Sequence, residues 1–161
     1  MQAFEDGPIE GVVVRDLVRH DDHRGWLAEV FRQDEIRPEH KPVMGYVSVT
    51  RPGVVRGPHE HRDQTDFFCF VGPGTFQVHL WDNRPLSPTA GRRMVLEAGA
   101  VRKCVVIIPP GVVHAYQVIS AEEGLVINLP NRLFQGEGKR EPVDEIRWED
   151  AGESATPFKL G

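Results

Sequence analysis

Short runs of β-branched and aromatic residues, separated by glycine and proline, most constrain how this chain folds. The 16 glycines and 13 prolines are spread along the sequence rather than collected in one linker. Such punctuation is typical of many short strands joined by turns. The clearest runs lie at 11–18, 26–31, 44–50, 67–71, 75–81, 102–109, 115–120 and 124–130. These runs predict an all-β domain, either a jelly roll or a barrel.

Two of these runs also indicate how their strands are buried. The run at 75–81 alternates, so Phe76, Val78 and Leu80 share one face of the strand. The run "CVVIIP" does not alternate, and we expect it to be buried on both faces.

The length of the chain, 161 residues, suits one domain with a proper core and is too short for two. We therefore treat 1–161 as a single domain. Its core is expected at 11–130. The polar stretch at 131–161 is expected to be a C-terminal extension, mostly loop with a short helix and a closing segment.

Charge and hydropathy exclude several classes of partner. A formal net charge of -5 argues against binding of a DNA or RNA polymer, although a few converging arginines can still bind a small diphosphate. No segment approaches the ~18 apolar residues of a membrane span, and the first residues do not resemble a signal peptide. Cys69 and Cys104 lie inside apolar runs, which indicates buried thiols. We expect a cytoplasmic protein with no membrane partner.

The segment "RGPHEHRDQTDFF" holds the most informative cluster of polar residues. His59 and His61 share one face of a strand, and Glu60 points away. A direct count puts Asp66 on the opposite face, but the polar turn before it can reset the register. His114 follows a Pro-Pro-Gly corner. The set His59, His61, Asp66 and His114 suits one divalent transition metal, Fe, Mn, Co, Ni or Zn.

These residues resemble both motifs of the cupin superfamily, with "GVVRGPHEHRDQTD" as the first and "PPGVVH" as the second. Aspartate stands where glutamate is usual. Within the cupins, the chain is similar to the dTDP-4-dehydrorhamnose 3,5-epimerase family over roughly 11–150. The similar segments are "DDHRGWLAEVF", "SVTRPGVVRGPH", "SPTAG", "IPPGVVHAY" and "IRWED". The resemblance implies a homodimeric jelly roll that acts on a nucleoside-diphosphate 4-keto-6-deoxy sugar.

The resemblance also suggests roles for individual residues. It implies that His59 removes a proton beside the sugar ketone and that arginines bind the diphosphate. Tyr116 shares a strand face with His114 and is a further candidate pocket residue. We expect its ring to form part of the pocket wall rather than to act in catalysis. The candidate substrate-binding residues are Arg24, Glu29, Arg56 and Tyr116, and the candidate catalytic residues are His59 and His114.

The chain departs from the family at the two residues that assist the base. The family's tyrosine falls at Ile127 or Asn128, and its lysine falls at or next to Asp66, which reverses the charge where an oxyanion develops. The family's glutamine has become His61. A metal ion at these residues would replace the lysine as a Lewis acid. Without that ion, the epimerase interpretation requires no cofactor.

Three functions stay open at this point. The first is a sugar-nucleotide epimerase or isomerase, which the ordered family segments favour. The second is a metal-dependent cupin of another class, an oxygenase or a lyase on a small molecule, which the metal-type motif favours. The third is a nucleotide-sugar binding module without activity, which the missing tyrosine and lysine favour.

Overall fold

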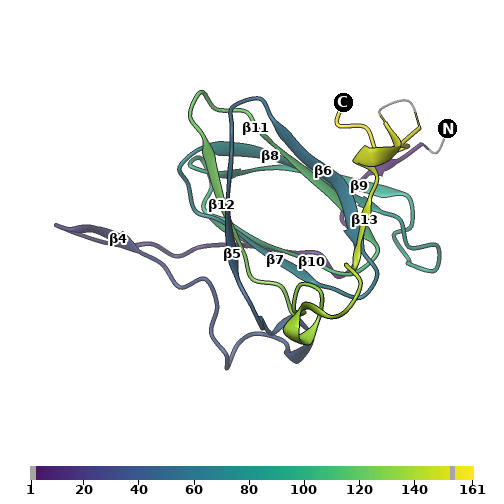
Figure 1. Ribbon diagram of the computed structural model, residues 1–161. Coiled ribbons are helices and arrows are strands. Elements are labelled where there is room, and N and C mark those ends of the chain that lie inside the picture. Colours follow the sequence, from purple (N-terminus) through teal and green to yellow (C-terminus); the bar gives the residue numbers. More distant parts are fainter. Residues whose placement is uncertain (1–2, 153–154) are drawn as a thin grey trace.

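The computed structural model describes residues 3–152 and 155–161, so four residues of the expected single domain, 1–2 and 153–154, lie outside the described part. Two large sheets face each other around an elongated interior (Figure 1). The strands are β1 (Glu5–Asp6), β2 (Val13–Asp16), β3 (His20–Asp22), β4 (Gly25–Leu27), β5 (Tyr46–Thr50), β6 (Val55–His61), β7 (Asp66–Phe70), β8 (Thr75–Asp82), β9 (Arg92–Gly99), β10 (Cys104–Ile108), β11 (Val112–Val118), β12 (Gly124–Asn128) and β13 (Glu145–Arg147). The 3₁₀ turns are η1 (Pro38–His40), η2 (Glu137–Lys139) and η3 (Glu149–Ala151).

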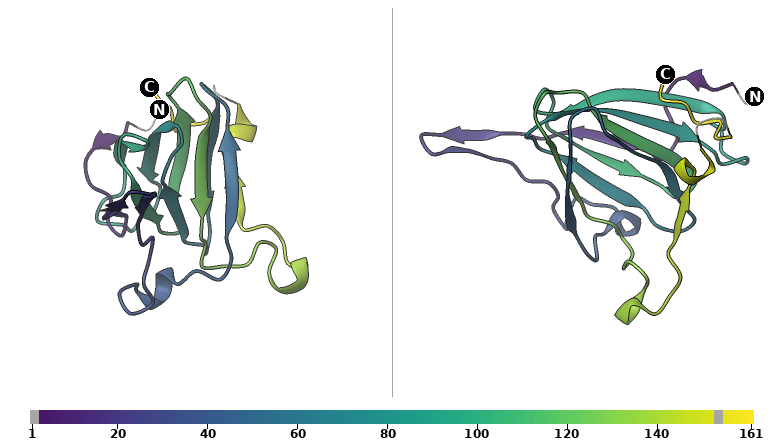
Figure 2. Two further views of the ribbon diagram at one scale, coloured as in Figure 1. Left: turned by 90° about the vertical axis from the view of Figure 1, so that its left-hand side faces the viewer. Right: turned by 45° about the horizontal axis from the view of Figure 1, so that its top comes forward.

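The sheets confirm the predicted all-β jelly roll. The six-stranded sheet has the order β1-β9-β8-β11-β6-β13, and the five-stranded sheet has the order β2-β10-β7-β12-β5. Most neighbours pair antiparallel; the exception is the parallel pair β1 and β9. Strands β3 and β4 form a separate hairpin that projects from the body of the molecule (Figure 2).

The structure differs from the predicted strands in several places. The run at 26–31 contributes only the residues of β4, because most of it continues as irregular chain beyond the hairpin. Strands β6 and β9 were not among the apolar runs. Both carry many polar side chains: β6 turns histidines toward the interior, and β9 has the partly exposed sequence "RRMVLEAG". Hydrophobic runs therefore underestimate strands that serve a polar site or a half-exposed face.

The core between the sheets has the predicted pattern. Phe76, Val78 and Leu80 are buried together in the main cluster, which confirms the alternation of β8. Strand β10 is buried on both faces, with Val106 in the main cluster and Val105 in a second one. Burial of such side chains contributes about 1.5–3 kcal/mol each.

The C-terminal segment covers the outer face of the six-stranded sheet. Phe158 is buried there against Trp81, and Trp148 packs edge-on against Phe158. This packing explains why Trp81 is buried although the alternation of β8 turns it away from the main core. The extension is thus a structural part of the jelly roll.

Cys69 and Cys104 are free and buried, as predicted. Burial raises the pKa of Cys69 to about 12 and that of Cys104 to about 11, so both thiols stay protonated. Among the described residues, no helix has the length and apolar composition needed to cross a bilayer.

Candidate active site

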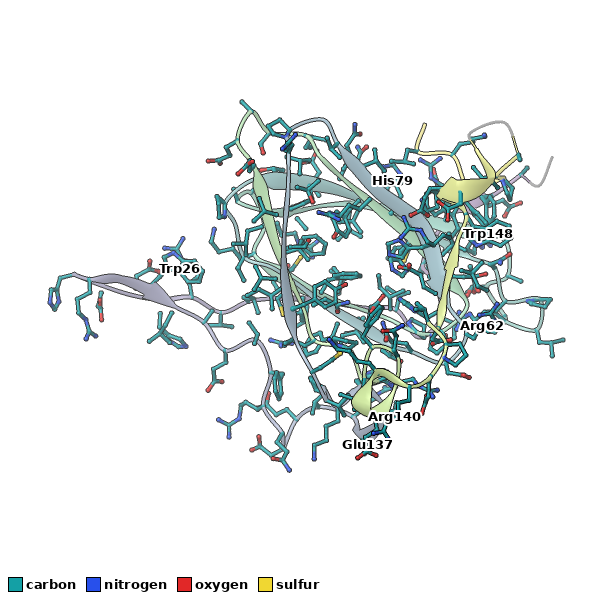
Figure 3. The ribbon with its side chains drawn as sticks, in the orientation of Figure 1. Trp26, Arg62, His79, Glu137, Arg140 and Trp148 are labelled. Atoms are coloured by element: carbon teal, nitrogen blue, oxygen red, sulfur yellow. The ribbon has the colours of Figure 1, made fainter. Side chains whose placement is uncertain are left out.

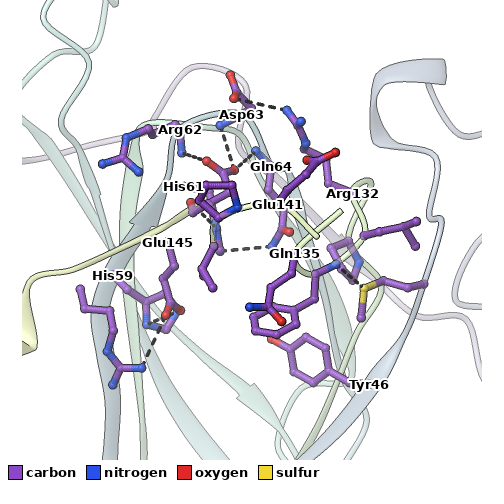
Figure 4. A pocket seen from close by; sticks show the side chains of 18 of the residues that line it. Tyr46, His59, His61, Arg62, Asp63, Gln64, Arg132, Gln135, Glu141 and Glu145 are labelled. Atoms are coloured by element: carbon purple, nitrogen blue, oxygen red, sulfur yellow. Dashed lines mark hydrogen bonds and ion pairs between the residues drawn. The ribbon is translucent and has the colours of Figure 1, made fainter. Parts of the chain in front are cut away.

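A pocket of about 1200 Å³ opens between β5 and β6 and is closed on one side by the C-terminal extension (Figure 4). Strand β6 contributes Arg56, His59 and His61 to its wall. The extension contributes most of the residues from Arg132 to Glu145, together with Arg147 and Glu149. This part of the chain, predicted to be mostly loop, therefore forms a large share of the pocket.

A bulge in β6 turns both Arg56 and His59 toward the pocket. On β11, the partners of His59 and Arg56 are His114 and Tyr116, so three steps along β6 match two steps along β11. In a regular strand, Arg56 and His59 would point to opposite faces. The extra residue of the bulge places both side chains on the pocket face. Gly57 permits this conformation, because its φ is +91° and a Cβ there would lie 2.6 Å from the carbonyl oxygen of His114.

Asp66 lies at the centre of the predicted histidine cluster. Its Oδ2 atom is 3.1 Å from Nε2 of His61 and 3.1 Å from Nε2 of His114. The turn between β6 and β7 therefore resets the register and brings the carboxylate to the histidine side. Asp66 and His114 are fully buried, whereas His61 lines the pocket. Glu60 points away from the cluster, as predicted, and accepts hydrogen bonds from Asn83 and Trp148.

His59 stands apart from the group formed by His61, Asp66 and His114, whose ligand atoms all lie within 4.8 Å of one another. Its ring packs edge-on against His114, with centroids 4.4 Å apart, and its Nδ1 is 3.9 Å from Oε1 of Glu145. Burial, with His114 beside it, holds the pKa of His59 well below its usual range. His59 is therefore a neutral imidazole at pH 7.

Asp144 fixes the turn that carries this cluster. Its carboxylate accepts hydrogen bonds from the backbone N–H groups of Arg62, Asp63 and Gln64, at 3.1, 3.1 and 2.8 Å. Its carbonyl oxygen accepts a hydrogen bond from Nδ1 of His61 at 3.0 Å. The extension thus holds both the turn and the ring orientation of His61.

Asn128 joins the cluster to a tyrosine on the neighbouring strand. Its Nδ2 donates to Oη of Tyr46 at 3.0 Å and to Oδ1 of Asp66 at 2.8 Å, and its Oδ1 accepts from the N–H of Phe67. Burial raises the pKa of Tyr46, so the phenol stays protonated. Figure 4 shows the Tyr46 ring pointing into the pocket from the side opposite His59.

Arg56 and Tyr116 occupy the same pocket. Arg56 donates to Oγ1 of Thr50 at 2.8 Å and to the carbonyl of Val49, both neutral acceptors. Tyr116 is almost fully buried; its hydroxyl lies 3.3 Å from Oγ of Ser48. Its ring packs edge-on against Phe68, Phe70 and Phe76, which makes it chiefly a wall of the pocket and the core.

Arg24 and Glu29 do not line the pocket of their own chain. Arg24 pairs with Asp22 at the end of the β3–β4 hairpin, and Glu29 lies 3.5 Å from Arg32 in the exposed chain after it. Figure 3 shows Trp26 of this hairpin far from Arg62, which lines the pocket. Each of the two candidates predicted to bind the nucleotide thus pairs with a residue near it in the sequence, and neither lies beside His59 of its own chain.

Sequence reasoning placed Tyr46 near the pocket without giving it a role, and it missed Asn128 as the partner of Tyr46, as well as Asp144 and Glu145. For the last two, a signal was present, because they directly precede the "IRW" of the recognised segment "IRWED". For Tyr46, no signal of a role is present in the linear sequence. Its place follows from the pairing of β5 with β12, in which Tyr46 is opposite Asn128.

Comparisons with known proteins agree with this fold. The family model for dTDP-4-dehydrorhamnose 3,5-epimerase matches residues 6–152. The chain is 40% identical over 130 residues to the probable low-salt glycan biosynthesis epimerase Agl13 of Haloferax volcanii, covering 80% of this chain and 83% of the relative. It is 35% identical over 140 residues to the spore coat polysaccharide biosynthesis protein SpsL of Bacillus subtilis, covering 85% and 91%.

The fold is also similar to the crystal structure of a dTDP sugar isomerase from Desulfovibrio desulfuricans G20. The TM-score is 0.78 at 24% identity, and the match covers 94% of this chain and 91% of the other. The extent of the family match and the identity to two relatives confirm the resemblance predicted from the motifs. The chain belongs to the dTDP-4-dehydrorhamnose 3,5-epimerase family.

Proposed function

We propose that this protein epimerises a nucleoside-diphosphate 4-keto-6-deoxy sugar at a carbon beside the ketone, with His59 as the base. The observation that carries the proposal is the position of His59 in the pocket of a member of this epimerase family, with its Nδ1 3.9 Å from Oε1 of Glu145. In the reaction His59 accepts a proton from the carbon, and the electron pair of the C–H bond moves into the enolate. The imidazolium that results faces the carboxylate of Glu145, which stabilises its charge.

Inversion requires a second group that returns a proton to the opposite face of the carbon. Tyr46 has the chemistry and the direction for this role. Asn128 donates to its oxygen, so the phenolic hydrogen is free to point at a ligand. Its pKa is raised by burial, which keeps it a proton donor in the resting enzyme. Tyr46 would thereby replace, from β5, the tyrosine that the family carries at the position of Ile127 or Asn128.

The nucleotide would be held by the basic side of the pocket. Arg56 donates two of its hydrogen bonds to neutral oxygens, so its positive charge is not neutralised by a carboxylate in the described contacts. A planar guanidinium suits the bidentate recognition of a diphosphate. Other cationic residues along the pocket are Arg62, Arg132, Lys139 and Arg147.

The predicted homodimer would give Arg24 and Glu29 a role in the site. The β3–β4 hairpin projects from the barrel (Figure 1), and Leu27 on it is 59% exposed. Edge strand β5 also exposes Val47 and Val49. An edge strand and a projecting arm that both expose apolar side chains favour pairing with a second copy. In such a dimer the arm of one chain would reach the pocket of the other.

Two experiments test the proposal. First, the protein is incubated in heavy water with a dTDP-linked 4-keto-6-deoxy hexose, and the ring protons are followed by NMR. Exchange beside the ketone with formation of an epimer supports the function, whereas tight binding without exchange favours a binding module. No exchange and no binding favours a cupin of another reaction class.

Second, two inactive variants, Arg24→Ala and His59→Asn, are mixed after mild dissociation. If the arm serves the partner's pocket, mixed dimers contain one intact site and activity returns. If the mixture remains inactive although mixed dimers form, the arm of one chain does not contribute to the pocket of the other. Light scattering checks that the dimers exist.

A further inference from the structure

Three side chains from three different strands bring ligand atoms to one point. They are Nε2 of His61 on β6, Oδ2 of Asp66 on β7 and Nε2 of His114 on β11, all within 4.8 Å of one another. We infer that these three residues form a binding site for one divalent transition-metal ion, and that His59 is not a ligand. The inference concerns binding alone and does not depend on the proposed epimerase reaction.

Hydrogen bonds fix the tautomers of both histidines. Nδ1 of His61 lies 3.0 Å from the carbonyl oxygen of Asp144, and Nδ1 of His114 lies 3.2 Å from the carbonyl oxygen of Val112. A carbonyl only accepts, so in each ring the hydrogen of the neutral form is on Nδ1. Nε2 then carries the lone pair in both rings, as metal-binding histidines require.

The carboxylate of Asp66 is oriented in the same way. Its Oδ1 accepts hydrogen bonds from Nε2 of Gln64 and Nδ2 of Asn128, both at 2.8 Å. These two donors leave Oδ2 as the oxygen that faces the histidines. Three acceptors, two imidazole nitrogens and one carboxylate oxygen, therefore point at one another.

This arrangement suits a cation. Nε2 of His114 is buried and makes no hydrogen bond within the described part of the chain, although it lies 3.1 Å from Oδ2 of Asp66. A buried acceptor that faces another acceptor is costly. Nε2 of His61 also lies 3.2 Å from the side-chain amide nitrogen of Gln64, so the competing arrangement is one proton on His114 with the Gln64 amide donating to His61. One metal ion would instead bind all three atoms.

The donor set decides the class of ion. Two imidazole nitrogens and one carboxylate oxygen suit Fe, Mn, Co, Ni or Zn and are a poor set for Mg²⁺ or Ca²⁺. His61 lines the pocket, which gives the ion an entry path. When bound, such an ion would supply a Lewis acid at Asp66, where the family has its lysine.

The site also differs from the four-residue set predicted from the motif. His59 lies outside the group of converging atoms; its Nδ1 faces Glu145, and its ring is edge-on to His114. This leaves His59 available to accept a proton while the three other residues bind the ion.

Metal titration of untagged protein tests the inference. The chain is stripped with a chelator and titrated with Co²⁺ and Zn²⁺ by calorimetry, and the visible absorption of Co²⁺ reports imidazole ligation. We expect one ion per chain. Asp66→Asn and His61→Gln should each lower the affinity at least about 100-fold. His61→Gln decides the matter if Asp66→Asn fails to fold, as judged by circular dichroism.

Two control variants sharpen the test. His79→Gln changes a buried histidine that hydrogen-bonds Gln77 on another face of the sheet and should bind the ion as the wild type does. His59→Asn should also retain the wild-type affinity. Absence of stoichiometric binding, or equal binding by Asp66→Asn and His61→Gln, overturns the site. A loss in His59→Asn as large as that in Asp66→Asn overturns the assignment of three ligands.

Discussion

The side-chain amide of Asn128 donates a hydrogen bond to the phenol oxygen of Tyr46 at 3.0 Å, across the paired strands β12 and β5. The same amide nitrogen donates to Asp66 at 2.8 Å. Asn128 thus connects a protonated phenol on one wall of the pocket with the carboxylate of the histidine cluster on the other. The resemblance places the family's tyrosine at Ile127 or Asn128, and at the second of these positions this chain has an amide that orients a tyrosine on the strand beside it.

Tyr46→Phe should separate proton removal from inversion. His59 still removes the proton, so exchange with heavy water continues, but formation of the epimer falls about 100-fold because the opposite donor is lost. NMR of the ring protons measures both rates. Tyr116→Phe is the comparison, since its hydroxyl contacts Ser48 instead. If Tyr116→Phe blocks inversion and Tyr46→Phe does not, the assigned phenol is wrong.

Asp144→Ala should destabilise the protein by about 2 kcal/mol, because three backbone N–H groups of the β6–β7 turn lose their acceptor. Urea unfolding measures the change. Asp63→Ala is the matched control in the same turn; its exposed carboxylate forms only a surface pair with Arg132 among the described contacts, and its loss should cost less than about 1 kcal/mol. Equal effects of the two substitutions would contradict the role given to Asp144.

Gly57→Ala tests the bulge in β6. The new Cβ would lie 2.6 Å from the carbonyl oxygen of His114, so the strand has to shift and the free energy of unfolding should fall. Gly53→Ala has a similar positive φ, +74°, but open space around it. We expect Gly57→Ala to cost about 2 kcal/mol more than Gly53→Ala in urea unfolding. Gly57→Ala should also lower activity, because Arg56 and His59 would no longer point to the same face of the strand. Indistinguishable variants would show that the close approach does not matter.

Asp82 gives a prediction for acid stability. Burial opposes its charge, but hydrogen bonds from Arg84, Ser87 and Thr89 outweigh this and lower its pKa to about 2, from 3.8. Since the folded pKa is the lower one, the ionised carboxylate stabilises the fold above about pH 4. This contribution, about 2 kcal/mol, is lost as the pH falls toward 2, and roughly half is gone at pH 3.

The Asp82→Asn variant lacks this titration. Urea unfolding at pH 7 and pH 3 should therefore show about 1 kcal/mol less acid destabilisation for the variant than for the wild type. The same acid destabilisation in both proteins would mean that Asp82 is not the group responsible.

The sequence predicted the fold class because strands such as β8 and β10 owe their pattern to burial alone. Its apolar runs missed β6 and β9, whose side chains meet a polar pocket or solvent, although the spacing of His59 and His61 predicted a strand within β6. Within the site, the motif spacing predicted that His59, His61 and His114 converge. The facing of Asp66 depends on a turn that Asp144, far along the chain, holds in place. Such long-range hydrogen bonds leave no periodic signal.

Two other features of the site required the pairing of strands and the path of the chain. Tyr46 is part of the site because β5 lies beside β12, and no spacing in the sequence connects Tyr46 with Asn128. Arg24 belongs to a recognised segment, but a hairpin carries it away from the barrel of its own chain. A family segment can therefore be identified correctly from the sequence, while its position relative to the pocket depends on the path of the chain.

The central claim is that His59 removes a proton beside the ketone of a nucleotide-linked sugar. Its most direct test compares the wild type with His59→Asn in heavy water, using a dTDP-linked 4-keto-6-deoxy hexose and NMR of the carbon-bound protons. The account predicts rapid deuterium incorporation with the wild type and a rate at least about 100-fold lower with the variant. Exchange by His59→Asn at the wild-type rate, with the fold intact by circular dichroism, would contradict it.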